Sequence, residues 1–222
     1  PFDRVAVLFL QAFQASADPA FGLMVGTMVQ PRSYQVLGYA VLSCDTLGEA
    51  IDRLVRYEKL VGKLGTSKLL AMENSWRLQW ACPIDGPWSR LLKEAAISGW
   101  ITLARQLVEN TPAFEVFFEH APAVDVARYE QVLGAPVHFG AEFTGVQLAS
   151  HALQTRMSGA DAGLRTLMDN QARVLLEEFD SRVNLVSEVR SALVKVLPDG
   201  EPTLDAVARR LGFSERVLQS RL

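Results

Sequence analysis

The 222-residue sequence contains only two cysteines, Cys44 and Cys82, and three histidines. Two cysteines cannot form a disulfide framework, so the class of small secreted disulfide scaffolds is excluded and a reducing cytoplasm is the expected compartment. The histidines, His120, His138 and His151, fall in separate predicted elements and lack metal-ligand spacing. We therefore expect neither a metal site nor another cofactor.

Long apolar runs are also scarce. One segment, residues 19–44, carries Arg32 as its only charge, and a membrane span needs about 20 mostly apolar residues. The sequence Gln30-Pro31-Arg32-Ser33 interrupts this segment at its middle, so we expect two packed helices and no membrane span. The first residues lack the basic and apolar regions of a signal peptide, and no export is expected.

A net basic charge is missing as well. The chain has 22 Lys plus Arg against 25 Asp plus Glu, a formal charge of -3, which gives no overall hint of a nucleic-acid partner. Hydrophobic residues make up 49% of the chain and charged residues 21%, so we expect one or two ordinary globular domains with a sizeable core. Hydrolase elbows, phosphate-binding glycine loops, zinc-protease helices and Cys-x-x-Cys pairs are all absent, so we do not expect an enzyme.

The spacing of apolar residues predicts helices and strands over the first 150 residues. Asp18 is expected to cap the second helix ahead of Pro19, and Thr46 and Glu49 are expected to form a capping box at the start of the fourth. Helices are expected at 3–17, 19–30, 37–43, 46–62, 88–109 and 124–133, a hairpin at 68–73 with 76–81, a central strand at 114–120 and a second hairpin at 137–139 with 143–148. This order predicts an α+β fold in which N-terminal helices and further packed helices lie against a small, mainly antiparallel sheet.

After residue 150 the pattern is helical. We expect one amphipathic helix at 160–182 and a second at 183–197, ended by Pro198-Asp199-Gly200. The first helix needs a partner for its apolar stripe, either the preceding domain or a second copy of the chain, so a homodimer is expected.

The last twenty residues have the pattern of a helix-turn-helix. Thr203 and Ser214 are placed to cap two short helices, and Gly212 lies where the turn needs a positive φ. The small Ala208 permits close approach of the two helices, and Leu218 is spaced to bury against the first.

Residues 214–222 would be the recognition helix, which enters the major groove of DNA. Arginine can read guanine and glutamine can read adenine, and residues 183–222 hold six Lys plus Arg against five acids. The expected DNA-binding residues are Arg216, Gln219, Ser220 and Arg221.

Residues 197–222 resemble the start of the DNA-binding domain of AraC/XylS-type bacterial transcription regulators. Five further segments are similar to the arabinose-binding-like sensor domain of one subgroup of these regulators: 18–23, 37–43, 46–50, 129–134 and 136–141. The resemblance implies a cytoplasmic, ligand-responsive regulator that binds promoter DNA and a small organic effector. Such regulators have two helix-turn-helix units, so the chain is expected to be a piece of a longer protein, cut within the first unit.

The resemblance divides the chain into an effector-sensing and dimerisation domain with a connector helix, residues 1–182, and an all-α, incomplete DNA-binding domain, residues 183–222. Candidate effector-binding residues are Trp80, Trp100, Phe117 and His120, since binding pockets are mostly apolar with a few polar groups. The alternative is a small-molecule-binding dimerisation module without a DNA role.

Overall fold

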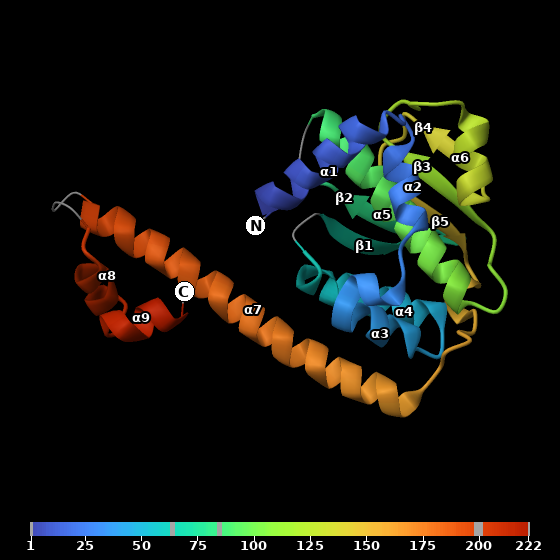
Figure 1. The fold of residues 1–222 in the computed structure, drawn as a ribbon. Helices are drawn as coiled ribbons and strands as arrows, with labels where there is room; N and C mark the ends of the chain where they lie inside the picture. Colours follow the sequence, from blue (N-terminus) through green and yellow to red (C-terminus); the bar gives the residue numbers. More distant parts are fainter. Residues whose placement is uncertain (1, 63–64, 84–85, 198–201, 222) are drawn as a thin grey trace. The chain divides into compact units, whose positions relative to one another are not determined.

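The computed structural model describes residues 2–62, 65–83, 86–197 and 202–221. The chain forms two compact units, Pro1–Ala172 and Arg173–Leu222, which are described separately below (Figure 1). None of the helices in the described ranges is long and apolar enough to span a bilayer.

The first unit combines six helices, the beginning of a seventh and a five-stranded sheet within its described residues (Figure 1). Three 3-10 turns connect them: η1 (Pro31–Tyr34), η2 (Glu58–Leu60) and η3 (Ala152–Gln154). The helices are α1 (Phe2–Ser16), α2 (Phe21–Thr27), α3 (Gln35–Leu42), α4 (Leu47–Tyr57), α5 (Pro87–Leu107) and α6 (Val126–Leu133), and the strands are β1 (Thr66–Ala71), β2 (Ser75–Ala81), β3 (Phe114–Phe118), β4 (Val137–Phe139) and β5 (Gly145–Ala149).

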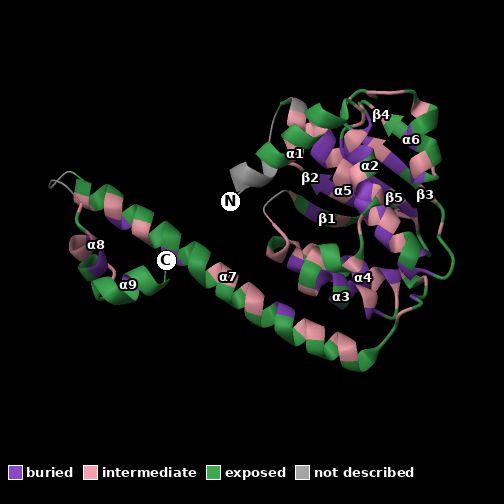
Figure 2. Ribbon diagram, viewed as in Figure 1, coloured by how far each residue is buried: buried purple, intermediate pink, exposed green. Residues whose placement is uncertain are grey.

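The sheet has the strand order β1-β2-β5-β3-β4. Three neighbouring pairs are antiparallel, and β3 pairs with β4 in parallel. Alternate residues of the strands point to opposite faces. One face, with Leu78, Val116 and Val146, is buried, whereas Glu115 and His138 on the other face are exposed. Figure 2 shows buried residues, in purple, in the sheet and in α2 and α5. The expected α+β fold with a mainly antiparallel sheet is confirmed.

The predicted hairpin at 137–139 with 143–148 is wrong. β4 and β5 are not neighbours, because β3 lies between them in the sheet. The helix α6 connects β3 to β4 as a crossover, which makes those two strands parallel. The chain then returns to the middle of the sheet, where β5 pairs with both β2 and β3. The short spacing between the two segments in the sequence favours a hairpin. The observed strand order depends instead on pairing with β3, which is distant in the sequence.

Two predicted helix boundaries also need correction. Asp18 and Pro19 do not open α2, which begins at Phe21, because the Asp18 carboxylate accepts a hydrogen bond from the Ala20 amide at 2.9 Å and holds a turn there. The fourth helix does start after Thr46, whose hydroxyl accepts from the Glu49 amide, but it ends at Tyr57 and continues as η2.

Close packing joins α2 to α5. Gly22 and Gly26 of α2 face α5 so closely that a Cβ on Gly26 would lie 2.4 Å from Cβ of Ser98. Glu94 of α5 is fully buried near this contact and accepts hydrogen bonds from Tyr129 of α6 at 2.6 Å and from Arg90 at 2.9 Å. A buried carboxylate requires such partners.

A single helix, α7 (Ala162–Val196), replaces the two helices predicted at 160–182 and 183–197. The sequence around the predicted break, Asp180-Ser-Arg-Val-Asn-Leu185, contains neither glycine nor proline, so nothing ends the helix there. The predicted stop at Pro198-Asp199-Gly200 lies outside the described residues.

The second unit contains most of α7 together with α8 (Leu204–Arg210) and α9 (Glu215–Arg221). The core of this unit contains residues from α7 and from the two short helices. Leu185 and Ala192 of α7 are buried with Val207 and Ala208 of α8 and with Leu218 of α9, which is fully buried.

Candidate functional site: an apolar cavity and a helix-turn-helix

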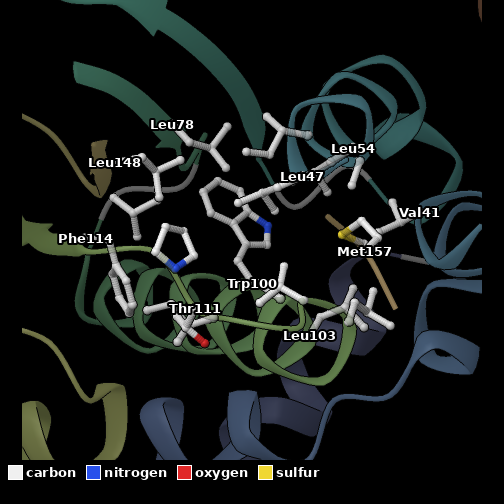
Figure 3. A pocket seen from close by; sticks show the side chains of 18 of the residues that line it. Val41, Leu47, Leu54, Leu78, Trp100, Leu103, Thr111, Phe114, Leu148 and Met157 are labelled. Atoms are coloured by element: carbon white, nitrogen blue, oxygen red, sulfur yellow. The ribbon is translucent and has the colours of Figure 1, made fainter. Parts of the chain in front are cut away.

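A cavity of about 100 Å³ lies in the first unit, where α3, α4 and α5 meet the covered face of the sheet (Figure 3). Trp100 extends from α5 toward it, and Phe114 and Leu148 approach from the strands (Figure 3). The lining residues are Tyr34, Leu37, Gly38, Val41, Leu47, Ala50, Ile51, Leu54, Leu78, Trp100, Ile101, Leu103, Ala104, Leu107, Val108, Thr111, Pro112, Phe114, Val146, Leu148 and Met157.

The periodicity of the surrounding elements explains why these residues converge. Leu47, Ile51 and Leu54 follow one stripe of α4, at the i, i+4 and i+7 positions of a helix face. Leu78 of β2 and Val146 of β5 are paired in the sheet and point to the same side. The cavity is therefore lined by apolar faces that the sequence pattern predicts to be buried.

No residue in this lining carries a formal charge. The polar atoms of its side chains are the Thr111 hydroxyl, the Tyr34 phenol and the indole nitrogen of Trp100. Burial raises the pKa of Tyr34 to about 12, so this phenol is neutral at physiological pH. The cavity thus suits uncharged, apolar chemical groups.

A second, polar groove adjoins the cavity. Thr111 and Pro112 line both, and the volume of the groove is about 480 Å³. The remaining residues of the groove are Glu109, Asn110, Ala113, His151, Thr155 and Arg156. Charged and polar side chains therefore begin where the apolar lining ends.

The structure brings one of the four predicted effector-binding residues, Trp100, to the cavity. Trp80 is buried elsewhere on the sheet, where its ring packs directly against Gly65. Phe117 lies on the other face of the sheet, stacked on His138 and Phe143 with ring centroids 4.7 and 4.9 Å apart.

The fourth predicted residue, His120, contacts the rings of Phe118 and Phe139 and does not line the cavity. Burial lowers the pKa of His120. The other lining residues carry no separate sequence signal, because an aliphatic residue in a cavity wall has the same periodicity as one in a packed core.

Charged residues tie α4 to the first turns of α7. Arg53 of α4 donates two hydrogen bonds to the Asp169 carboxylate, from Nε at 2.9 Å and from Nη2 at 2.7 Å. Arg165 of α7 bonds Asp45 and also Glu49, the latter at 3.3 Å. One side of α4 therefore lines the cavity while another holds α7.

The second unit has the geometry expected for a helix-turn-helix. Gly212 adopts φ of 74° in the turn between α8 and α9. The Thr203 hydroxyl accepts a hydrogen bond from the Ala206 amide, and the Ser214 hydroxyl accepts one from the Val217 amide. These caps and the burial of Leu218 agree with the roles predicted for them.

All four predicted DNA-binding residues lie on α9 with exposed side chains. Arg216, Gln219 and Ser220 follow the i, i+3, i+4 spacing of one helix face, while the Arg221 guanidinium lies 4.9 Å from the centroid of the Phe213 ring. Across the described part of the chain, His, Cys, Asp and Glu side chains nowhere form a group of three or more that could hold a metal ion.

A family model matches most of the chain, and two known proteins are similar to it. Residues 1–157 match the arabinose-binding domain of AraC transcription regulators, found at their N-terminus. The chain is 28% identical over 208 residues to the ornithine utilization regulator of Pseudomonas aeruginosa, with 92% of this chain and 61% of that protein aligned. It therefore spans less than two thirds of the length of this relative.

The fold is similar to the crystal structure of the transcriptional regulator CdpR from Pseudomonas aeruginosa. The TM-score is 0.57 at 21% sequence identity, with 92% of this chain and 67% of that chain covered. The first of these proteins is named a regulator of ornithine utilization and the second a transcriptional regulator. The chain belongs to the AraC family of transcription regulators and carries their arabinose-binding-like N-terminal domain.

Proposed function

We propose that the chain is the sensor and the first part of the DNA-binding domain of a ligand-responsive transcription regulator. In this proposal residues 1–182 sense the effector and residues 183–222 begin the DNA-binding domain. The observation that carries the proposal is that one helix, α7, contributes to both parts. Its first turns bind α4, which lines the apolar cavity, and Leu185 and Ala192 near its other end pack against the helix-turn-helix.

The proposed mechanism is a shift between conformations. A ligand changes the populations of two conformations only when it binds one of them more tightly. Two features connect the cavity to α7: the ion pairs of α4, and Met157, which lines the cavity five residues before α7 begins. An effector that favours one position of α4 or Met157 would thereby change how the first turns of α7 are held.

DNA recognition is assigned to α9. Arg216 and Gln219 are proposed to contact base edges, and Ser220 and Arg221 to contact bases or phosphates. Their exposed side chains leave these groups free to meet DNA. Replacing Arg216 or Gln219 by alanine is expected to weaken binding to the cognate site by about 1–3 kcal/mol at its contacted base.

A dimer is proposed to present two recognition helices. Leu167 and Val174 support this part of the proposal, since they are seven residues apart on α7 and their exposed fractions are 61% and 42%. Exposed apolar residues at heptad spacing are typical of a helix that pairs with another. Glutamate at both positions is expected to convert a dimer to a monomer in light scattering.

The cavity does not suit ornithine, the compound in the name of the relative. Ornithine carries charged groups at both ends, and charged groups are strongly disfavoured in a cavity without a charged partner. The lining of this cavity contains none. We therefore propose a small organic effector with an apolar part, sensed in the cytoplasm.

A mobility shift with the full-length protein and DNA from upstream of its own gene tests the proposed function. Specific, salt-dependent binding is expected, because phosphate contacts release counterions. Gln219→Ala is expected to weaken it, whereas Gln154→Ala in η3 serves as a matched control outside α9. Absent or salt-insensitive binding would instead favour the alternative, a binding module without a DNA role.

A further inference from the structure

The lining of the cavity limits what part of a ligand can enter it. Leu37, Ile51, Leu103 and Leu148 are representative of its aliphatic walls, and no charged side chain lies among the lining residues. Moving an ionised carboxylate or ammonium group into such surroundings is strongly unfavourable unless a partner neutralises it. The buried part of the ligand must therefore be uncharged and apolar.

The volume of the cavity limits the size of that part. At about 100 Å³ the cavity is smaller than the 150 Å³ that suffices for benzene in an apolar protein interior. By that comparison it has room for about four carbon atoms of an alkyl chain. A sugar ring would fit poorly for a second reason, since its hydroxyl groups would find few hydrogen-bond partners.

The adjoining groove offers what the cavity lacks. Arg156 lines it with an exposed side chain, and this guanidinium makes no ion pair with the residues that the structure describes. A free guanidinium can bind a carboxylate through two parallel hydrogen bonds. Glu109 lies in the same groove, and its negative charge disfavours a second acidic group on the ligand.

Thr111 and Pro112 are shared by the two spaces, because they line both the cavity and the groove. We propose that cavity and groove form one amphiphilic site for a short-chain aliphatic monocarboxylic acid. Its alkyl chain occupies the cavity and its carboxylate passes Thr111 to bind Arg156. This inference rests on the proposed sensing function and names the class of ligand sensed.

Hexanoate and its neutral isostere hexanamide test the assignment of the carboxylate. Isothermal titration of the 222-residue chain is expected to show binding of hexanoate at one site. Arg156→Ala should lower the affinity for hexanoate about tenfold and leave the affinity for hexanamide within twofold, because only the acid uses the guanidinium. Arg32→Ala is the control, since Arg32 is exposed in η1 and lines neither space.

A cavity-filling substitution tests the assignment of the alkyl chain. Ala104→Leu on α5 is expected to abolish binding of both compounds, because the added carbons occupy the cavity. Ala127→Leu on α6 makes the same change at an exposed position and should bind normally. Val41→Leu, a smaller change in the lining, provides the same test if Ala104→Leu fails to fold by circular dichroism.

The inference is overturned if native protein does not bind hexanoate, or if lysine or glucose binds more tightly than hexanoate. It is also overturned if Arg156→Ala lowers the affinities for hexanoate and hexanamide equally. These results can be distinguished from a failure of the proposed function. Binding of lysine or glucose together with specific DNA binding by the full-length protein would refute the ligand class alone, whereas loss of DNA binding would refute the regulator.

Discussion

Arg53 and Asp169 form a two-pronged ion pair that joins α4 to α7, with N to O distances of 2.9 and 2.7 Å. Arg53 is well shielded, since 16% of its side chain is exposed. The pair matters because α4 contributes Leu47, Ile51 and Leu54 to the cavity. The helix that lines the cavity is thus also the helix that binds the start of α7.

Breaking this pair should destabilise the first unit. Arg53→Ala is expected to cost about 1.5–3 kcal/mol, the usual contribution of hydrogen bonds to charged groups. Arg53→Lys should recover part of the loss, because lysine keeps the charge but cannot donate the paired hydrogen bonds. Urea unfolding measures both changes in the free energy of unfolding.

Arg173 and Glu177 on α7 provide the matched control for Arg53. They form an exposed pair one helical turn apart, with 60% and 65% of their side chains exposed. Arg173→Ala should cost about 0.3–0.5 kcal/mol. Equal losses for Arg53→Ala and Arg173→Ala would contradict a stabilising role for the contact between α4 and α7.

Gly26 is expected to tolerate no side chain. An added Cβ would lie 2.7 Å from the Ala95 carbonyl oxygen and 2.7 Å from the Gly99 amide nitrogen, both backbone atoms of α5. Gly26→Ala should therefore cost about 1–3 kcal/mol through overpacking. Gly163→Ala on α7, where the added Cβ would lie 3.4 Å from an Asp161 carboxylate oxygen, should instead raise stability by up to about 1 kcal/mol. Thermal unfolding of the two variants would show opposite shifts in Tm, and shifts of the same sign would count against the packing described for α2.

Substitutions of Gly212 test whether the turn of the helix-turn-helix needs glycine. Its φ of 74° is unfavourable for residues with a Cβ, although no other atom crowds the position. Gly212→Ala should destabilise the second unit by about 1–2 kcal/mol, and Gly212→Asn by less, because asparagine tolerates this conformation better. Hydrogen exchange of α8 and α9 amides measures the effect locally. Exchange as slow in Gly212→Ala as in the native chain would show that the turn does not need glycine.

Glu94 gives the stability of the first unit a pH dependence of known sign. Burial raises its pKa above the ordinary 4.5, although Tyr129 and Arg90 partly oppose the shift. The folded state then binds a proton more tightly than the unfolded state, so stability is highest below 4.5 and falls as the pH rises through the raised pKa. Glu94→Gln removes this titration while keeping an acceptor for Tyr129.

The measurement is urea unfolding of native protein and Glu94→Gln at several pH values from 4.5 to 7. Relative to Glu94→Gln, the native protein should lose stability as the pH rises. A difference between the two proteins that stays constant, or grows in favour of the native protein, would contradict the raised pKa.

Much of the fold follows from local sequence signals. The alternation of Trp76, Leu78 and Trp80 predicts β2, and the spacing of Thr203, Gly212 and Ser214 predicts the helix-turn-helix, because caps, turns and strand alternation depend on neighbouring residues. Strand order does not depend on neighbours alone. β3 lies between β4 and β5 because it pairs with strands that are more than twenty residues away in the sequence, and no local pattern encodes such pairing.

The cavity was harder to predict than the fold. Trp100 is a predicted pocket residue because it is aromatic and lies where the helix at 88–109 meets the sheet, but Trp80 and Phe117 share these properties and lie elsewhere. Whether an aliphatic side chain lines a void or fills a core depends on how α3, α4 and α5 pack together. No sequence pattern predicts Arg156 as a binding residue either, since its place in the groove results from the conformation of the loop before α7.

The most direct test of the account measures DNA binding by the full-length regulator with and without hexanoate, in native protein and in Ala104→Leu. We expect hexanoate to change the affinity of native protein for its own upstream DNA by at least about fivefold, the lower range of allosteric coupling. The Ala104→Leu protein should bind the same DNA with no response to hexanoate. An equal response in both proteins, or no specific DNA binding by native protein, would contradict the claim that this cavity controls a transcription regulator.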